Sequence, residues 1–206
     1  MAITINGTGS ITGLTAGGLP DGSVTAADIE TSLDLTGKTV TLPSGTGGKV
    51  LKVVQTQFTD VFSITSGEDT WVTVTGFSAA ITPSASANNI LVMCQVGRAG
   101  STANGNRQVN FRLTKDGTAY AVPPAAGNRQ LASFSLKSSD GAYNNGGGVV
   151  YMDTAGGTSE ITYQVQMMNQ VGGETTRINT AGGNIDSADA PWARTVSSIT
   201  LMEIAA

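Results

Sequence analysis

The chain contains no histidine among its 206 residues. Histidine is the commonest general base in enzymes and a frequent metal ligand, so its absence excludes every Ser-His or Cys-His catalytic pair. The single cysteine, Cys94, excludes an intrachain disulfide framework. No run of about 18 apolar residues occurs, and we therefore predict no membrane insertion. These absences also lead us to predict a protein without a cofactor or a metal site.

Charged residues are scarce as well. They make up 13% of the chain, compared with about 25% in an average protein, and the net charge is −4. The basic residues are scattered singly, whereas a phosphate-binding surface needs a cluster of them, so we predict no nucleic-acid partner. Residues 1–7 lack a basic segment and a long apolar one, which argues against a signal peptide and predicts folding in a cytoplasm.

Glycine, in contrast, is abundant. It supplies 27 of the 206 residues, against an average share of about 7%. Serine, threonine and asparagine are frequent too, and no long helical periodicity appears after residue 48. This composition predicts a β-rich protein with many turns and neutral polar surfaces, which is typical of secreted domains and of virion structural proteins.

The chain changes character at residues 44–48, a run of serine, threonine and glycine that we interpret as a domain boundary. Residues 1–48 contain short alternating stretches interrupted by glycine, with a helical turn predicted at 28–33 and a strand at 38–43. No part of this segment has a face large enough to be buried alone. We predict that it is an attachment or shaft segment, either a flexible tether or a region where identical copies wind together.

Residues 49–206 are predicted to form one folded domain made of strands. Several stretches alternate cleanly between apolar and polar side chains, and Asp116-Gly117 is a strong signal for a tight hairpin turn. The predicted strands are 49–64, 70–75 with 79–81, 89–98, 108–115, 118–122, 131–136, 147–153, 160–169, 175–179 and 194–204. So many short strands in about 155 residues indicate an all-β fold, a jelly-roll-like β-sandwich.

The last predicted strand, Arg194–Ile204, is apolar on both faces. Ile199 and Leu201 point to one side, while Val196, Met202 and Ile204 point to the other. A sandwich buries only one face of each sheet, so the second face needs a cover. Residues 49–64 show the same property, and we therefore predict a homotrimer. Ile199, Leu201, Met202 and Ile204 are the residues predicted to form this strand of the core and the trimer interface.

Two polar loops, residues 99–107 and 138–148, are the candidate recognition site, because loops on a rigid sandwich often carry binding. We predict that Tyr143 makes the recognition contact together with its amide neighbours and two arginines, because an aromatic ring flanked by amides suits a sugar. The predicted contact residues are Tyr143, Asn144, Asn145, Arg107 and Arg129. The alternative is that both loops are only solvated connectors.

Three other features have plainer interpretations. Cys94 lies on the apolar face of a predicted strand, which indicates a buried structural thiol. Asp186 and Asp189 share one loop, which we interpret as solvated, a calcium site being the alternative. Trp192, between Pro191 and Ala193, is predicted to plug the edge of the sandwich.

Several strand patterns resemble the C-terminal trimeric jelly-roll domain of tailed-bacteriophage fibre-like virion proteins. They are 73–84 (Thr-Val-Thr-Gly-Phe-Ser-Ala-Ala-Ile-Thr-Pro-Ser), 89–92, 111–117, 162–166 and 198–204, and residues 3–28 look like the short shaft that precedes such domains. The resemblance implies a homotrimer in the virion, assembled in the host cytoplasm, with residues 1–48 bound to other virion proteins. It implies a non-enzymatic short fibre whose jelly roll meets the host surface, with a cell-surface glycan as the candidate partner. The alternative is a capsid decoration or cement protein. The enzyme alternative is a polysaccharide depolymerase, which would need a pair of carboxylates in a groove, and the few acidic residues of this sequence show no evident pair.

Overall fold

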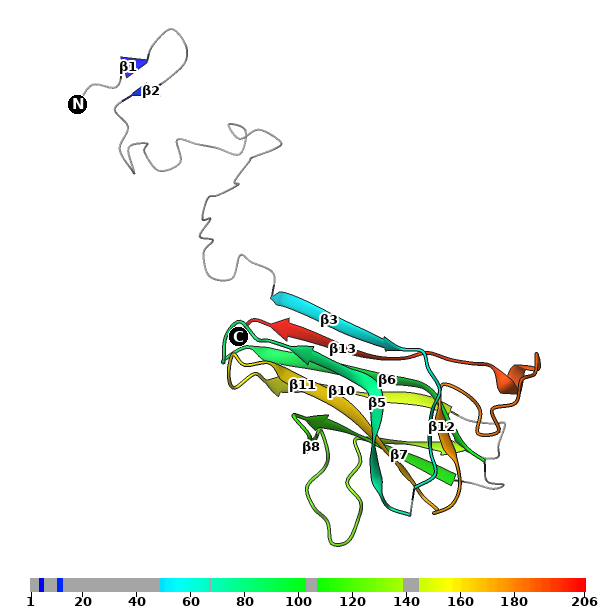
Figure 1. Ribbon diagram of the computed structural model, residues 1–206. Coiled ribbons are helices and arrows are strands. Elements are labelled where there is room, and N and C mark those ends of the chain that lie inside the picture. The colour runs from blue at the N-terminus through cyan, green and yellow to red at the C-terminus, as the bar shows by residue number, and fades with distance from the viewer. Residues whose placement is uncertain (1–3, 6–10, 13–48, 67, 103–106, 139–144) are drawn as a thin grey trace. The chain divides into compact units, whose positions relative to one another are not determined.

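The computed structural model describes residues 4, 5, 11, 12, 49–66, 68–102, 107–138 and 145–206 (Figure 1). The chain divides into two compact units, Met1–Gly47 and Gly48–Ala206. In the first unit, β1 (Thr4–Ile5) pairs with β2 (Ile11–Thr12) in an antiparallel ladder. The helical turn predicted at 28–33 and the strand predicted at 38–43 lie outside the described residues.

The second unit is a sandwich of two antiparallel sheets. The strands of the first sheet are β3 (Val50–Phe58), β13 (Ser197–Ile204), β6 (Asn89–Ser101) and β10 (Asn145–Thr154), with β12 (Thr176–Ile178) and β4 (Phe62–Ile64) beside one end of β6. The strands of the second sheet are β5 (Trp71–Ile81), β11 (Ile161–Asn169), β7 (Arg107–Lys115), β9 (Phe134–Ser138) and β8 (Thr118–Tyr120).

The strand order is that of a jelly roll. Neighbouring strands run β3-β13-β6-β10 in one sheet and β5-β11-β7-β9 in the other. Each of these strands crosses to the opposite sheet from its predecessor, except that β9 follows β7 within one sheet. This alternation produces the two interlocked Greek keys of an eight-stranded jelly roll. The predicted all-β fold class is confirmed.

The core lies between the sheets and follows the alternation of the sequence. Ile90, Val92, Cys94 and Val96 share the inner face of β6 and are almost fully buried, as the sequence predicted. Burial raises the pKa of the Cys94 thiol to about 12, so this cysteine is a structural, unreactive group. The inner faces of β7 and β11 are also buried as predicted; their residues are Val109, Phe111, Leu113, Ile161, Tyr163, Val165 and Met167.

Two predicted strand boundaries are wrong, each for a local reason. The strand predicted at 49–64 is interrupted between Phe58 and Phe62, where the chain leaves β3 and β4 pairs instead with β12. The two strands predicted at 70–75 and 79–81 form one continuous strand, β5. This strand accommodates a bulge opposite β11 because Gly76 adopts a φ of +84°, which a side chain would disfavour.

Other boundaries shift by a few residues. The closing strand β13 begins at Ser197, so residues 194–196 belong to the preceding loop and not to the strand. The strand predicted at 147–153 extends to Asn145–Thr154 as β10, so it includes the glycines at 146–148, which were also counted in the predicted recognition loop. They allow close strand packing, since a Cβ atom at Gly148 would collide with the carbonyl oxygen of Cys94. The Asp116-Gly117 hairpin is confirmed, with both residues at positive φ.

One carboxylate is buried at the end of the sandwich where β13 finishes. Glu203 shares the inner face of β13 with Ile199 and Leu201 and is 1% exposed. Its Oε1 accepts hydrogen bonds from the backbone N–H and the hydroxyl of Ser84, at 2.6 and 2.7 Å, and from Nδ2 of Asn88 at 2.7 Å. Hydrogen bonds from Asn88 and then Ser84 hold the pKa of Glu203 below its ordinary value of 4.5.

This lowered pKa predicts acid sensitivity. Because the folded state prefers the charged form, Glu203 stabilises the fold above its ordinary pKa, and this stability is lost as the pH falls through the lower pKa of the folded protein. Glu203→Gln should destabilise the protein at neutral pH by about 1–3 kcal/mol, because a neutral amide oxygen accepts the hydrogen bonds from Ser84 and Asn88 more weakly than a carboxylate oxygen does. It should also flatten the dependence of the unfolding free energy on pH. Urea titrations of both proteins from neutral to acidic pH test this, and an unchanged slope in the variant would contradict it.

Candidate functional site

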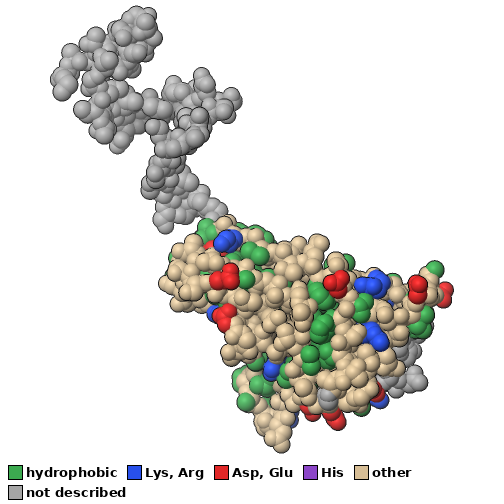
Figure 2. All heavy atoms as spheres, viewed as in Figure 1, with side chains coloured by type: hydrophobic (Ala, Val, Ile, Leu, Met, Phe, Trp, Pro, Cys, Tyr) green, Lys and Arg blue, Asp and Glu red, His purple; other side chains and the backbone are tan. Residues whose placement is uncertain are grey.

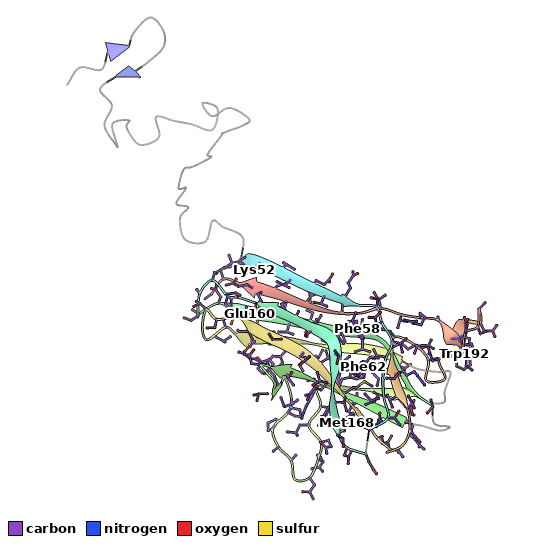
Figure 3. All side chains as sticks on the ribbon, in the orientation of Figure 1. Lys52, Phe58, Phe62, Glu160, Met168 and Trp192 are labelled. Atoms are coloured by element: carbon purple, nitrogen blue, oxygen red, sulfur yellow. The ribbon has the colours of Figure 1, made fainter. Side chains whose placement is uncertain are left out.

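The two ends of the sandwich differ in what they carry. At one end, the backbone N–H of Ala205 donates to the carbonyl of Lys49, so the point where the chain joins the sandwich lies beside the C-terminus. In Figure 3, Lys52 lies toward this end and Trp192 lies at the opposite end. We call this opposite end the distal end; it includes the β12–β13 loop, residues 179–196. The β12–β13 loop thus lies at the end of the sandwich opposite to Lys49 and Ala205.

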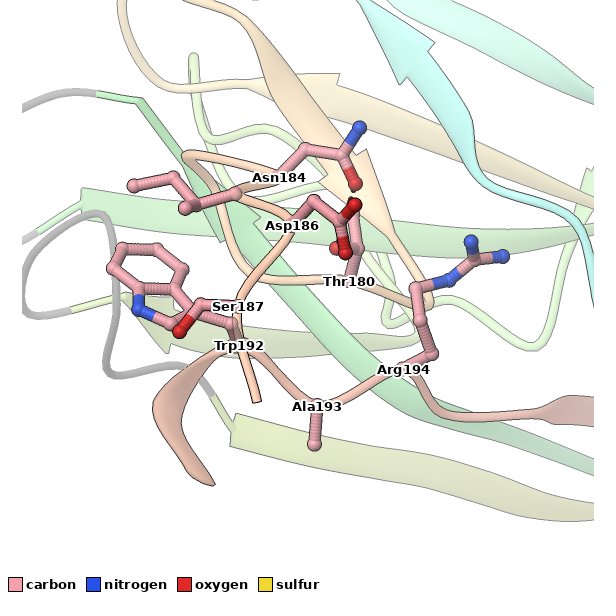
Figure 4. Close-up of a pocket in the computed structure, with 8 residues that line it drawn as sticks. Thr180, Asn184, Asp186, Ser187, Trp192, Ala193 and Arg194 are labelled. Atoms are coloured by element: carbon pink, nitrogen blue, oxygen red, sulfur yellow. Dashed lines mark hydrogen bonds between the residues drawn. The ribbon is translucent and has the colours of Figure 1, made fainter. Parts of the chain in front are cut away.

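The distal end contains a surface pocket of about 340 Å³, formed by the β12–β13 loop (Figure 4). The half-buried indole of Trp192, from the 3-10 turn η2 (Ala190–Trp192), lies on one side, and the Arg194 side chain lies across from it. The remaining polar lining comes from Thr180, Asn184, Asp186 and Ser187. A pocket of this size falls within the range that holds small ligands.

The pocket loop is fixed to the sandwich by Asn179, which is fully buried and has a φ of +64°. Its side-chain Nδ2 donates to the carbonyls of Phe58 and Asp60, at 2.7 and 3.0 Å, and its Oδ1 accepts from the Ser197 hydroxyl at 2.6 Å. Its carbonyl accepts from the Thr195 N–H at 3.1 Å. The same residue therefore ends β12, terminates β3 and anchors the start of β13.

Further hydrogen bonds hold the pocket walls. Arg194 donates from Nε to the carbonyl of Asn179 at 3.2 Å and from a terminal nitrogen to the carbonyl of Thr59 at 3.1 Å. Arg98 on β6 donates to the carbonyl of Ala193 at 2.9 Å. Arg177 on β12 donates to the carbonyl of Gly182. The loop is long, but these contacts make its shape a fixed part of the fold.

Two pocket groups retain their full hydrogen-bonding capacity. Among the described residues, no hydrogen bond reaches the Asp186 carboxylate or the indole N–H of Trp192. A third pocket residue, Asn184, uses only its Oδ1, which accepts from the Thr180 hydroxyl at 2.9 Å. The pocket thus offers a carboxylate acceptor, an amide donor and an aromatic face. One carboxylate and one guanidinium give the lining no net charge.

Comparison with known proteins gives weak matches. No protein-family model and no curated protein matches the sequence. Among solved structures, a chain from the infectious bursal disease virus Gt strain is 17% identical with a TM-score of 0.37, over 75% of this chain and 38% of that one. A chain from the VP2 subviral particle of the same virus is 17% identical with a TM-score of 0.34, over 75% and 37%. This chain spans less than two fifths of the length of these viral proteins, and the jelly-roll assignment therefore rests on the strand order.

The predicted contact residues are only partly brought together. Asn145 begins β10 and pairs with Ala99 of β6. On its other side, Ala99 pairs with Ile178, the last residue of β12 before the pocket loop. Asn145 and the pocket thus share the distal end. Arg107 begins β7, and its Nε and NH2 donate to the Glu174 carboxylate, each at 3.2 Å. This pair connects β7 to the β11–β12 loop.

The other predicted contact residues lie elsewhere. Arg129 belongs to the β8–β9 connection, where it donates to the carbonyl of Ala126 at 3.0 Å. The next residue, Gln130, accepts from the indole of Trp71 on β5. Tyr143 and Asn144 lie outside the described residues, so their role stays a prediction.

The residues predicted for the core and the trimer interface occupy two faces of β13. Ile199 and Leu201 are fully buried in the sandwich core, whereas Met202 and Ile204 face outward and are half-buried. Met202 pairs with Val53 of β3 on one side and with Leu91 of β6 on the other. Leu91 in turn pairs with Met152 of β10. An apolar row therefore crosses the outer face of all four strands.

We call this outer face the apolar face. Its residues are Val53, Gln55, Gln57, Asn89, Leu91, Met93, Gln95, Gly148, Val150, Met152, Thr154, Ser198, Thr200, Met202 and Ile204. None of them is charged, and Val53, Val150 and Met152 are at least half exposed. Elsewhere on the surface shown in Figure 2, acidic and basic side chains are interspersed. A continuous apolar strip without charge is typical of an interaction surface.

Two carboxylates in the described core are committed to structure. Glu203 is satisfied by Ser84 and Asn88, as described above. Asp153 on β10 forms an ion pair with Lys115 at 2.7 Å and accepts a hydrogen bond from Tyr163, which joins the two sheets. Burial would raise the pKa of Asp153, but the hydrogen bonds from Lys115, Tyr120 and Tyr163 outweigh it and lower that pKa. Both carboxylates are therefore held in their charged form by hydrogen bonds within the fold.

The described ranges contain no group of three or more His, Cys, Asp or Glu side chains that could hold a metal ion. In the loop that holds the two aspartates, Asp189 accepts from the Ser187 hydroxyl at 2.9 Å, whereas Asp186 lines the pocket. Within the same ranges, no helix is long and apolar enough to cross a membrane.

The pocket was missed by sequence reasoning. Trp192 was predicted to plug the edge of the sandwich, and Asp186 to be solvated in a plain loop, yet both line one cavity. The available signal was the run Asn184-Ile-Asp-Ser187 followed by Pro191-Trp-Ala-Arg194, which combines amide, carboxylate, aromatic and guanidinium groups in eleven residues. The spacing gave no sign that the two halves of the loop face each other.

Proposed function

We propose that this chain is a non-enzymatic virion structural protein: a short homotrimeric fibre attached to the particle by residues 1–48, with the distal end of its jelly roll directed to the host surface. The observation that carries the proposal is the apolar face, which a single chain leaves uncovered. The resemblance of the strand patterns to fibre-like virion proteins supports the same assignment.

The size of the apolar face suits a subunit interface. Four strands about 4.8 Å apart and eight residues of about 3.4 Å each cover roughly 500 Å² in projection, and the accessible area is larger. A standard interface buries about 800 Å² of accessible surface on each partner. The apolar face thus approaches the required area, and the surrounding strand ends supply the rest.

The absence of charge favours a second copy of this chain as the occupant. The protein has a net charge of −4, so most pairs of surfaces from two copies repel each other weakly. The apolar face avoids this repulsion because it has no charged residue. A closed ring of three copies satisfies each interface and leaves no open end.

The two-ended arrangement supports fibre-like use. The chain joins the sandwich beside the C-terminus, while the pocket and Asn145 lie at the distal end. An N-terminal attachment segment would therefore direct the distal loops away from the particle. Jelly-roll proteins have many different functions, so the fold alone does not support the proposal. Its support comes from the apolar face, together with this orientation of the two ends.

A particle experiment tests the function. Particles that lack this protein should assemble normally but adsorb poorly to host cells, and particles supplied with a chain lacking residues 1–48 should adsorb equally poorly. Quantitative mass spectrometry should find a few trimers per particle. Unstable shells with normal adsorption and a copy number comparable to that of the shell subunit would instead indicate the decoration role. A stable monomer in sedimentation equilibrium at micromolar concentration would contradict the trimer.

A further inference from the structure

We propose that the β12–β13 pocket is a binding site for a neutral saccharide, with Trp192 as the stacking platform and Asp186 as the principal hydroxyl acceptor. The inference rests on the proposed host-surface role, which it deepens by naming a site and a ligand class. It moves the expected contact from Tyr143 to the β12–β13 loop, which lies at the same end of the sandwich as Asn145.

The shape and lining of the pocket suit a sugar ring. A pyranose has an apolar C–H face and a rim of hydroxyl groups, so it needs an aromatic surface next to mixed donors and acceptors. Figure 4 shows the Trp192 indole on one side of the pocket and the Asn184 and Asp186 side chains on the other, pointing toward the side where Arg194 lies. The cavity of about 340 Å³ has room for one or two sugar units.

The groups that would bind hydroxyls are available in the folded protein. The Asp186 carboxylate is exposed and accepts no hydrogen bond from any described residue, and the Asn184 amide accepts from Thr180 through Oδ1, which leaves its N–H₂ free to donate. A carboxylate can accept from two adjacent hydroxyls of one sugar.

The charges of the pocket argue for a neutral ligand. Asp186 would repel a phosphate or a carboxylate ligand, and Arg194 would repel an ammonium group. The Arg194 guanidinium already donates to the carbonyls of Asn179 and Thr59, so it serves as a wall of the pocket more than as an anion receptor. A neutral molecule with several hydroxyl groups is repelled by neither side chain.

The pocket is also preformed, which reduces the entropic cost of binding. Its loop is fixed by Asn179, Arg98 and Arg177 through bonds to three different strands or their ends. A single site of this kind binds sugars weakly, because each hydroxyl exchanges one hydrogen bond with water for another. Three copies on one trimer would raise the effective affinity by about a hundredfold or more toward a repeating surface glycan.

The test uses the fact that the protein has two tryptophans. Trp71→Phe leaves Trp192 as the reporter, and Trp71 lies on the other sheet against Arg112. In the full-length Trp71→Phe protein, millimolar titrations with neutral hexoses, 6-deoxyhexoses, N-acetylhexosamines and their disaccharides should give a saturable change in Trp192 fluorescence for at least one sugar. Saturation-transfer NMR should show the strongest contact at the C–H face of that sugar.

Asp186→Asn should weaken the sugar affinity by about tenfold, since it replaces a charged acceptor by a neutral one at the same position. Lys137→Gln, which changes an exposed charge on β9, is the control and should leave the affinity unchanged. No saturable response to any sugar of the panel would overturn the proposal, as would saturable binding of tetramethylammonium or inorganic phosphate in its place. If no sugar binds, the saccharide site is contradicted, but the trimer and the fibre role are still tested by the sedimentation and particle experiments. If the chain binds sugar but is never found on particles, the fibre role is contradicted and the saccharide site is not.

Discussion

Lysines at two exposed positions of the apolar face should separate the proposed trimer into monomers. Val53 on β3 and Met152 on β10 are 55% and 50% exposed in the single chain, at opposite ends of the apolar row. In the assembly, Val53→Lys/Met152→Lys would bury two charges without partners. We expect the dissociation constant to rise by at least about a hundredfold, or about 2.7 kcal/mol per interface.

The matched control for this variant is Ile185→Lys, because Ile185 is 52% exposed but belongs to the pocket loop. It should leave the assembly intact. Sedimentation equilibrium across a wide range of protein concentration measures both proteins, and far-ultraviolet circular dichroism checks that the double variant keeps its β structure. A double variant that sediments with the mass of the wild-type assembly would remove the apolar face from the interface.

Asn179→Ala should be the most damaging single substitution in the distal half of the sandwich. It leaves the carbonyls of Phe58 and Asp60 and the Ser197 hydroxyl without their partner in a buried site. It also places alanine at a φ of +64°, which asparagine tolerates better. Together these effects should lower the unfolding free energy by about 3–5 kcal/mol. The melting temperature should fall by roughly 10 °C or more.

Asn184 provides a matched control, since it too has a positive φ, of 46°, but is exposed and bonds to Thr180. Asn184→Ala should therefore cost about 1 kcal/mol or less. Thermal unfolding at one fixed protein concentration compares the two variants, because assembly makes the melting temperature depend on concentration. Equal losses for both substitutions would show that backbone strain, and not the buried hydrogen bonds, explains the role of Asn179.

Sequence patterns alone predict the fold class and most of the core correctly. The alternation of apolar and polar residues correctly predicted the buried inner faces of β6, β7 and β11, within residues 89–98, 108–115 and 160–169. It could do so because side chains on a strand alternate strictly between its two sides. The Asp116-Gly117 pair fixed a hairpin, since few dipeptides accept positive φ at both positions. The apolar pattern on both sides of β13 also predicted apolar residues on the outer face, where Met202 and Ile204 lie half-buried in the single chain.

The contacts between distant segments could not be predicted from the sequence and emerge only from the three-dimensional fold. Alternation shows which side chains share a face but not which strands are neighbours, so the row from Val53 through Met202 and Leu91 to Met152 required the strand order. The pocket likewise depends on where Asn179 fixes the two ends of one loop, through bonds to residues more than a hundred positions earlier. Local sequence carries no signal for such contacts, because turn and strand preferences act over a few residues, whereas this site is assembled by hydrogen bonds between strands.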